Sequence, residues 1–141
     1  MDLMEKILEL SRQGYFCSQI LGTLLLETVG SENPELIRAL GGLDGGIGHS
    51  GSACGCLTAG CCVISYFTGK GEPEEEENPL HKEALSEYVR WFKEEMLVNY
   101  GGTDCADITD NNPARRVEVC PGVIADAYMK CMEILSEKEI I

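Results

Sequence analysis

The 141-residue sequence predicts an all-α protein, a compact bundle of about five helices with a glycine-rich loop. Three observations support this fold class. Apolar residues recur at helical spacing in several long segments. No alternation of apolar and polar residues is long enough to indicate a strand. The connections between the apolar segments are short, and the length fits a single domain, 1–141, that can bury its own core.

Three predicted helices precede the glycine-rich loop. The first begins near Leu3 and is interrupted at Gly14. The second, over 15–29, is apolar on nearly all sides, which is typical of a buried helix, and Gly30 fits its C-terminal end. The third is short, because Asn33 is a suitable N-cap, a proline follows at the first helical position, and the apolar pattern stops near Leu40.

The glycine-rich loop itself contains six glycines within 41–51. No regular element tolerates that density, so we expect a loop that turns sharply or brings its backbone close to another group. An apolar helix rich in small residues is predicted directly after it, over 53–67. Because small side chains let a neighbouring backbone approach closely, we expect this helix to be tightly packed.

The C-terminal half begins with an acidic linker over 69–79, which we interpret as a solvated loop. A helix with a strong apolar stripe follows, and Gly101 ends it. A polar loop over 103–113 then leads to a last helix, which the pattern predicts over 121–137.

The charge balance excludes several classes of partner. Lys and Arg number 11 against 24 Asp and Glu, which gives a net charge of −13. This argues against binding of nucleic acid or an anionic membrane surface, where basic residues supply most of the affinity. The apolar stretches are shorter than the roughly 20 residues that a membrane span needs, so we expect no membrane insertion. The N-terminus lacks the features of a secretory signal, so we expect a cytoplasmic protein.

The eight cysteines are the unusual feature of the chain. In a reducing compartment, several cysteines more often indicate metal binding or redox chemistry than stable disulfides. No two of them have Cys-x-x-Cys spacing, which argues against a thioredoxin-type motif and a zinc ribbon. Any site must therefore gather cysteines from distant segments.

Three cysteines are the strongest candidates for thiol chemistry. Cys54 follows the glycine-rich loop at the predicted first turn of a helix, where the helix dipole would lower its pKa and favour the thiolate. Cys105 and Cys120 lie in or beside the polar loop, and neither belongs to an apolar stripe. Because Cys120 precedes Pro121, we expect it at a helix start, in the same electrostatic position as Cys54.

The remaining cysteines are harder to assign. By position alone, Cys17 lies on an apolar helix and is expected to pack in the core. Cys61, Cys62 and Cys131 are also predicted to pack in the core. The assignment of Cys56 to the site or to the core stays open, because Cys56 can share a site with Cys54 only if the first helical turn is irregular.

The glycine-rich loop offers the other candidate ligands. We assign Gly46, Gly48 and His49 as its candidate cofactor-binding residues. His49 lies near Cys54 and could be a ligand, a proton donor or an exposed loop residue. No strand precedes the loop and no Lys-Ser/Thr follows it, which argues against a phosphate site.

Taken together, these segments resemble a family of redox-active proteins named C_GCAxxG_C_C for its cysteine pattern. The resemblance extends nearly end to end and places the four characteristic cysteines at Cys17, Cys54, Cys105 and Cys120. It rests on Gly-Tyr-Phe-Cys-Ser-Gln at 14–19, the glycine loop with Cys-Gly at 45–55, Gly-Thr-Asp-Cys at 102–105 and Val-Cys at 119–120.

The sequence also departs from the family at two positions. Cys56 stands where the family has Ala, and Ala59 stands where it has Gly. An alternative register over 55–60 would place Cys56 in the site instead of Cys54, and we prefer Cys54 because the glycine loop fixes the spacing before it.

The resemblance implies that Cys17, Cys54, Cys105 and Cys120 form one site. A related domain of a haem-containing cytochrome is associated with an iron–sulfur cluster, and four thiolates suit either such a cluster or zinc. The first hypothesis is therefore an electron-transfer protein with an iron–sulfur cluster or other metal. The alternatives are a thiol–disulfide redox protein with Cys54 as the reactive thiolate, and a structural zinc or metal-free helical interaction domain. We expect an unidentified redox partner and allow for a homodimer.

Overall fold

The computed structural model describes all residues, 1–141, and it is entirely helical apart from one isolated bridge between Ala53 and Asp104. The α-helices are α1 Leu3–Arg12, α2 Cys17–Val29, α3 Pro34–Leu40, α4 Gly55–Thr68, α5 His81–Tyr100, α6 Cys105–Ile108 and α7 Arg116–Glu137. Two short 3-10 helices, Gly41–Leu43 and Pro113–Arg115, lead into the glycine-rich loop and into α7.

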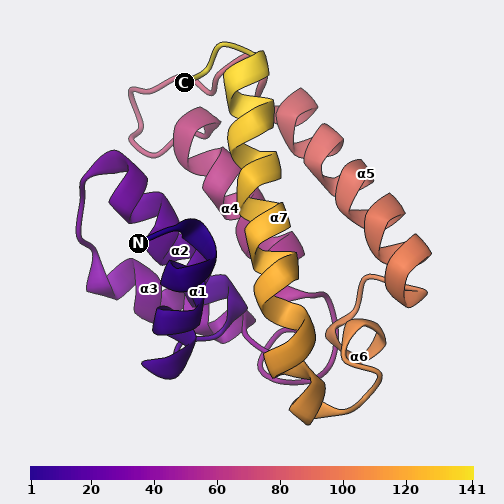
Figure 1. Cartoon of the computed structure of the whole chain (residues 1–141). Coiled ribbons are helices and arrows are strands. Elements are labelled where there is room, and N and C mark those ends of the chain that lie inside the picture. The colour runs from indigo at the N-terminus through magenta and orange to yellow at the C-terminus, as the bar shows by residue number, and fades with distance from the viewer.

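The bundle is built around α4 and α7 (Figure 1). Helices α1, α2 and α3 lie on one side of this pair and α5 lies on the other. The helix α4 packs against α2, α5 and α7, and α7 also packs against α1, α2 and α5. The prediction of an all-α fold is confirmed, but the helices number seven instead of about five. One of them, α6, lies within the polar stretch that we expected to be a loop, where no apolar stripe indicates a helix.

Several helix ends follow the predicted signals. The side chain of Asn33 caps α3, with its Oδ1 accepting a hydrogen bond from the backbone N–H of Leu36 at 3.1 Å. Gly30 and Gly101 end α2 and α5 with φ of 71° and 80°, in the left-handed region that glycine adopts most readily. The linker 69–79 has no helix or strand, as predicted.

The start of α7 differs from the prediction. This helix begins at Arg116, not at residue 121, and Pro121 lies inside it. Proline removes the hydrogen bond that its N–H would donate to the carbonyl of Val117. Val117 is exposed to solvent, so water can satisfy the carbonyl that is left without a donor. A proline therefore did not mark the start of the helix.

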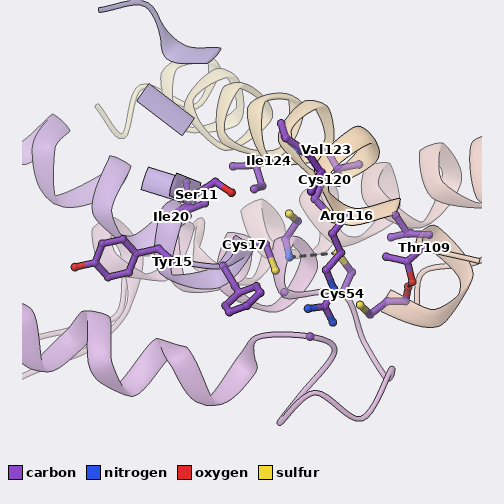
Figure 2. A pocket seen from close by; sticks show the side chains of 18 of the residues that line it. Ser11, Tyr15, Cys17, Ile20, Cys54, Thr109, Arg116, Cys120, Val123 and Ile124 are labelled. Carbon is purple, nitrogen blue, oxygen red and sulfur yellow. Dashed lines mark hydrogen bonds between the residues drawn. The ribbon is translucent and has the colours of Figure 1, made fainter. Parts of the chain in front are cut away.

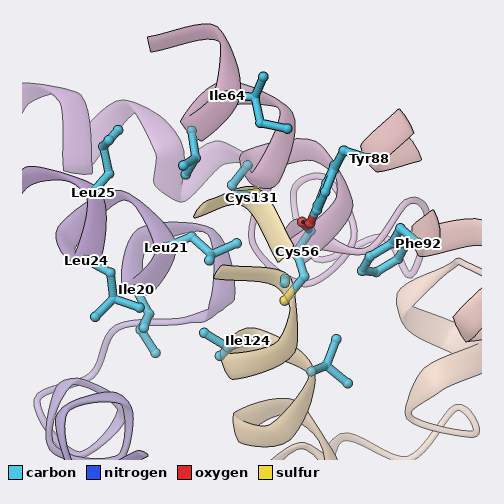
Figure 3. Packing of buried hydrophobic residues seen from close by; sticks show 14 of the residues in the cluster. Ile20, Leu21, Leu24, Leu25, Cys56, Ile64, Tyr88, Phe92, Ile124 and Cys131 are labelled. Carbon is cyan, nitrogen blue, oxygen red and sulfur yellow. Dashed lines mark hydrogen bonds between the residues drawn. The ribbon is translucent and has the colours of Figure 1, made fainter. Parts of the chain in front are cut away.

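The core gathers apolar side chains from six helices, and Figure 3 shows part of it. Its largest fully buried members, Tyr88 and Phe92, come from α5 and face α4. The Tyr88 hydroxyl donates a hydrogen bond of 2.6 Å to the backbone carbonyl of Cys56. This approach requires Gly60, because a Cβ atom there would overlap the Tyr88 hydroxyl. The small residues of α4 thus let α5 pack closely, as predicted.

None of the helices combines the length and the apolar composition that a membrane-spanning helix requires.

The contact between Gly60 and Tyr88 yields a testable prediction. Substitution Gly60→Ala should force Tyr88 away from α4 and break its bond to Cys56, and overpacking of this kind costs about 1–3 kcal/mol of unfolding free energy. The measurement is urea denaturation followed by circular dichroism. Gly122→Ala in α7 is the matched control, because nothing lies within 4 Å of its added Cβ; it should be neutral or stabilising by up to about 1 kcal/mol. Equal effects of the two variants would contradict the packing role.

Candidate functional site

Five of the eight cysteines line one cavity at an end of the bundle. The cavity has a volume of about 280 Å³ and is bounded by the start of α2, the start of α4, the glycine-rich loop, α6 and the first turns of α7. The four cysteines predicted to share a site all lie in its wall, and Figure 2 shows three of them, Cys17, Cys54 and Cys120. The fifth is Cys56. The fold therefore brings together thiols from four distant segments.

Backbone pairing places Cys54 beside Cys105. The N–H of Cys54 donates to the carbonyl of Thr103 at 3.1 Å, and the N–H of Cys105 donates to the carbonyl of Ser52 at 2.7 Å. A third bond, from Ala106 N–H to the Gly51 carbonyl at 3.2 Å, continues the pairing. The end of the glycine-rich loop and the segment before α6 are thus joined as a short two-stranded contact, which fixes two walls of the cavity relative to each other.

Glycines are required where the loop and the thiols approach each other. Gly46 has φ of 76°, and a Cβ atom there would lie 2.5 Å from the Ser52 carbonyl oxygen and 2.8 Å from the Cβ of Cys105. At Gly55, a Cβ atom would lie 2.5 Å from the sulfur of Cys17. The prediction that this loop brings its backbone close to another group is confirmed.

The predicted cofactor-binding residues of the loop lie outside the lining. Gly45 contributes to the cavity wall, whereas Gly46, Gly48 and His49 do not. Gly46 supports the wall from behind, through its contact with Cys105. His49 is exposed, and its ring meets the Phe16 ring edge-on with a centroid distance of 5.4 Å.

The thiol of Cys56 lies at the centre of the cysteine group. It is 1% exposed, and its backbone N–H contacts the sulfur of Cys54 at 3.4 Å. Hydrogen bonds that link the Cys56 thiol to Cys17 and Cys54, together with burial, raise the pKa of Cys56 well above its usual range. The same bond from Cys56 lowers the pKa of Cys17, against the effect of burial. Of this pair, Cys56 is therefore the thiol that keeps its proton, and Cys17 is the one that loses its proton more easily.

Cys54 and Cys120 occupy different positions in their helices. Cys54 is the N-cap of α4, at the helix start as predicted. The expectation that Cys120 begins a helix is wrong, because α7 starts at Arg116 and Cys120 lies one turn inside it. Burial, with the nearby Cys17 and Cys54 thiols, raises the pKa of Cys120 to about 12.

The three cysteines outside the cavity differ from one another. Cys131 is fully buried, and its thiol donates a weak hydrogen bond to the Gly60 carbonyl at 3.5 Å, so its assignment to the core is confirmed. Cys61 is half-buried, and burial raises its pKa to about 11. Cys62 is exposed, which contradicts the prediction that it packs in the core. The α4 sequence is apolar on nearly all sides, so periodicity could not identify its open face.

Sequence reasoning missed one functional candidate, Arg116. It is the only charged side chain that lines the cavity. Its guanidinium carbon lies 5.5 Å from the centroid of the Phe16 ring, and it is hydrogen-bonded to the Cys105 thiol. Burial raises the pKa of Cys105, and the charge of Arg116 opposes that rise. The signal in the sequence was the Arg115-Arg116 pair, which stands directly after a polar loop in a strongly acidic chain.

The cysteine group does not converge on a single point. No three Cys, His, Asp or Glu side chains lie close enough to hold one metal ion as they stand. Five cysteines line the cavity, and no carboxylate or imidazole lines it. The thiols therefore surround a space and do not form a closed tetrahedral shell.

The bond between Cys56 and Cys17 predicts a pH effect in the metal-free protein. A hydrogen bond donated to a thiolate lowers its pKa, so Cys56→Ala should raise the pKa of Cys17. The alkylation rate of Cys17, followed by mass spectrometry, should then increase at a higher pH than in the unchanged protein. Cys131→Ala removes a buried thiol outside the cavity and should leave that profile in place. An unchanged Cys17 profile in Cys56→Ala would rule out the bond as the cause.

A comparison with family models identifies the chain. A model described as "Putative redox-active protein (C_GCAxxG_C_C)" matches residues 15–134, a region that holds all eight cysteines. No curated protein and no solved structure matches the chain. The Gly-Cys-Ala-x-x-Gly element of the family name matches Gly-Cys-Leu-Thr-Ala-Gly at Gly55–Gly60 most directly, and this alignment selects Cys56. The spacing from the glycine-rich loop selects Cys54 instead. Because the match covers most of the chain, the protein belongs to the C_GCAxxG_C_C family.

Proposed function

We propose that this protein transfers electrons through an iron–sulfur cluster held in the cavity by Cys17, Cys54, Cys105 and Cys120. The observation that carries the proposal is the meeting of these four thiols, from α2, the start of α4, α6 and α7, around one cavity. Family membership supports a redox role in general terms. Bound there, a cluster would supply one-electron chemistry that no amino-acid side chain in the cavity provides.

The donor set supports a cluster over a single ion. Thiolates are the ligands that iron–sulfur clusters and zinc prefer, and no carboxylate lies in the cavity wall to favour a harder metal ion. A zinc ion holds its four sulfurs about 2.3 Å from one point. A cluster contains several iron and sulfide atoms, so its cysteine sulfurs stand farther apart around a central space. Thiols that surround a cavity without converging fit the second arrangement.

The surrounding residues would shield the site and order its ligands. The apolar side chains of Ile20, Val123 and Ile124 line the inner wall, where they would exclude water from the thiolates. Cys56 is positioned to donate its thiol proton to the sulfur of Cys17 and its backbone N–H to the sulfur of Cys54. In this arrangement Cys56 orients and stabilises the ligands and does not bind the cluster itself.

A second function is favoured by one contact. The thiols of Cys17 and Cys56 are hydrogen-bonded to each other, and this bond lowers the pKa of Cys17. The Cys17 thiolate could attack a partner disulfide, and Cys56 could then attack the mixed disulfide to release the partner. The result would be a Cys17–Cys56 disulfide, with two electrons and two protons transferred to the partner, which leaves as a dithiol. This pair differs from the Cys54-centred mechanism predicted from the sequence.

The test of the cluster is an anaerobic preparation of the full chain, with iron, sulfide and zinc measured per protein and the visible absorption recorded. We expect iron and sulfide in comparable amounts and an absorption that bleaches on reduction. The variants Cys17→Ser, Cys105→Ser and Cys120→Ser should each lose most of the iron. Cys62→Ser is the matched control and should keep it, because Cys62 is exposed outside the cavity.

The other outcomes discriminate between the functions. Zinc without iron would overturn electron transfer and favour a structural site. Metal-free protein with a reversible Cys17–Cys56 disulfide would favour the thiol–disulfide function. Iron that survives all three serine variants would contradict the assigned ligands.

A further inference from the structure

The cysteine cavity has a positive charge at one end. Arg116 is its only charged lining residue, and no carboxylate lies in the wall. Figure 2 shows the Arg116 side chain extending from α7 toward the end of the cavity where Cys54 lies. The guanidinium is half-buried, packs on the Phe16 ring and makes no ion pair with a carboxylate. In a chain of net charge −13, this is a local reversal of the surface charge.

The start of α7 adds to the positive potential. The helix has 22 residues and begins at Arg116, and no side chain caps its first N–H groups. The helix dipole adds positive potential beside this first turn, where the backbone N–H of Arg116 itself is bonded to the Pro113 carbonyl. Two of the neighbouring acidic residues are engaged elsewhere: Asp110 faces Arg115 at 3.8 Å, and Asp107 accepts from the backbone N–H of Asp104 at 3.2 Å. A third, Glu118 in the first turn of α7, is exposed and does not line the cavity.

The rest of the cavity determines what kind of anion would fit. Most of the lining residues are apolar, and the volume of about 280 Å³ allows only a small molecule. A ligand with one carboxylate or sulfonate group and a short apolar body would place its charge at Arg116 and its body against Ile108 and Val123. The thiols of Cys105 and Cys54 would then lie beside it.

We propose that Arg116 makes this cavity a binding site for small organic anions, and that it draws them to the thiols of Cys105 and Cys54. This property belongs to the metal-free protein and does not depend on the proposed cluster. It also supplies a substrate class for the thiol–disulfide function, namely small anionic thiols and disulfides.

The experiment compares two thiol reagents of similar size and opposite charge on the metal-free, reduced full chain. They are 2-sulfonatoethyl and 2-(trimethylammonio)ethyl methanethiosulfonate. In each case the cysteine thiolate forms a disulfide with the reagent sulfur, and methanesulfinate leaves. Modification of each cysteine is followed by peptide mass spectrometry. Both reagents react with the same thiolate, so the ratio of the anionic to the cationic modification rate does not depend on the thiolate fraction. The ratio therefore reports how the charge of the reagent affects its access to that cysteine.

Exposed Cys62 serves as the reference thiol inside the same molecule. We expect the rate ratio at Cys105 to exceed that at Cys62 by about 10-fold, because a cation in a cleft concentrates anions there. Arg116→Gln should bring the Cys105 ratio to within about twofold of the Cys62 ratio, and Arg116→Lys should keep most of the preference.

Arg115→Gln is the matched control, because it removes the same charge one residue away from a side chain that does not line the cavity. It should leave the preference at Cys105 in place. If Arg116→Gln fails to fold, the salt dependence of the unchanged protein provides the test, because screening should reduce the ratio at Cys105.

Three results would overturn the proposal. The first is that the rate ratios at Cys105 and Cys62 are equal in the unchanged protein. The second is that Arg115→Gln reduces the preference of Cys105 for the anionic reagent as much as Arg116→Gln does. The third is that neither reagent modifies Cys105. None of these depends on iron, so a failure here is distinct from a failure to find the cluster.

Discussion

The cavity depends on a short stretch of backbone pairing between the glycine-rich loop and the segment before α6. The bonds from Cys54 to Thr103 and from Cys105 to Ser52 join parts of the chain that are about fifty residues apart in sequence. Cys54 caps the start of α4 and Cys105 begins α6, so this pairing joins the starts of two helices and places their thiols side by side. The left-handed backbone at Gly46 makes the approach sterically allowed. The glycine density of the loop is thus a requirement of this contact.

The inner wall of the cavity has a different origin, because it is part of the core. The Tyr88 hydroxyl fixes the backbone of Cys56, and Tyr88 is itself held against α4 by the absence of a side chain at Gly60. Cys56 therefore sits inside a helix whose position is set by core packing, whereas Cys54 and Cys105 sit at the very starts of α4 and of the four-residue helix α6. One side of the cysteine group is rigid through close packing. The other depends on a few hydrogen bonds.

The sequence predicted the helices better than it predicted the site. Local signals at Gly30, Asn33 and Gly101 act within a few residues, so they gave helix ends that the structure confirms. Pro121 misled because a proline can lie inside a helix where solvent satisfies the freed carbonyl. The exposure of Cys62 depends on which faces of α4 the neighbouring helices cover. The sequence of a helix that is apolar on nearly all sides does not indicate which face stays exposed to solvent.

The site itself was predictable only in part. Cys54 stood out by its place after the glycine-rich loop at a helix start, and Cys105 and Cys120 because core packing explained them poorly. The fold does bring all three to one cavity. Cys17 lies on an apolar helix, and only the family resemblance separated it from the core residues. Arg116 was missed because its role arises from the cavity: a half-buried cation is informative once the surrounding residues are known to be uncharged.

The pKa shifts explain how the bundle can exist with and without a bound cofactor. Burial raises the pKa of Cys105 and Cys120, and hydrogen bonding together with burial raises that of Cys56, so at neutral pH these thiols hold their protons and the cavity carries little negative charge. A metal or cluster binds thiolates, so its binding must release protons and must strengthen as the pH rises toward those pKa values. The bound state would be anionic at the end of an apolar bundle, which is costly without compensation. Arg116 is the one residue of the wall whose charge can offset it, and this links the charge of the cavity to the chemistry of its cysteines.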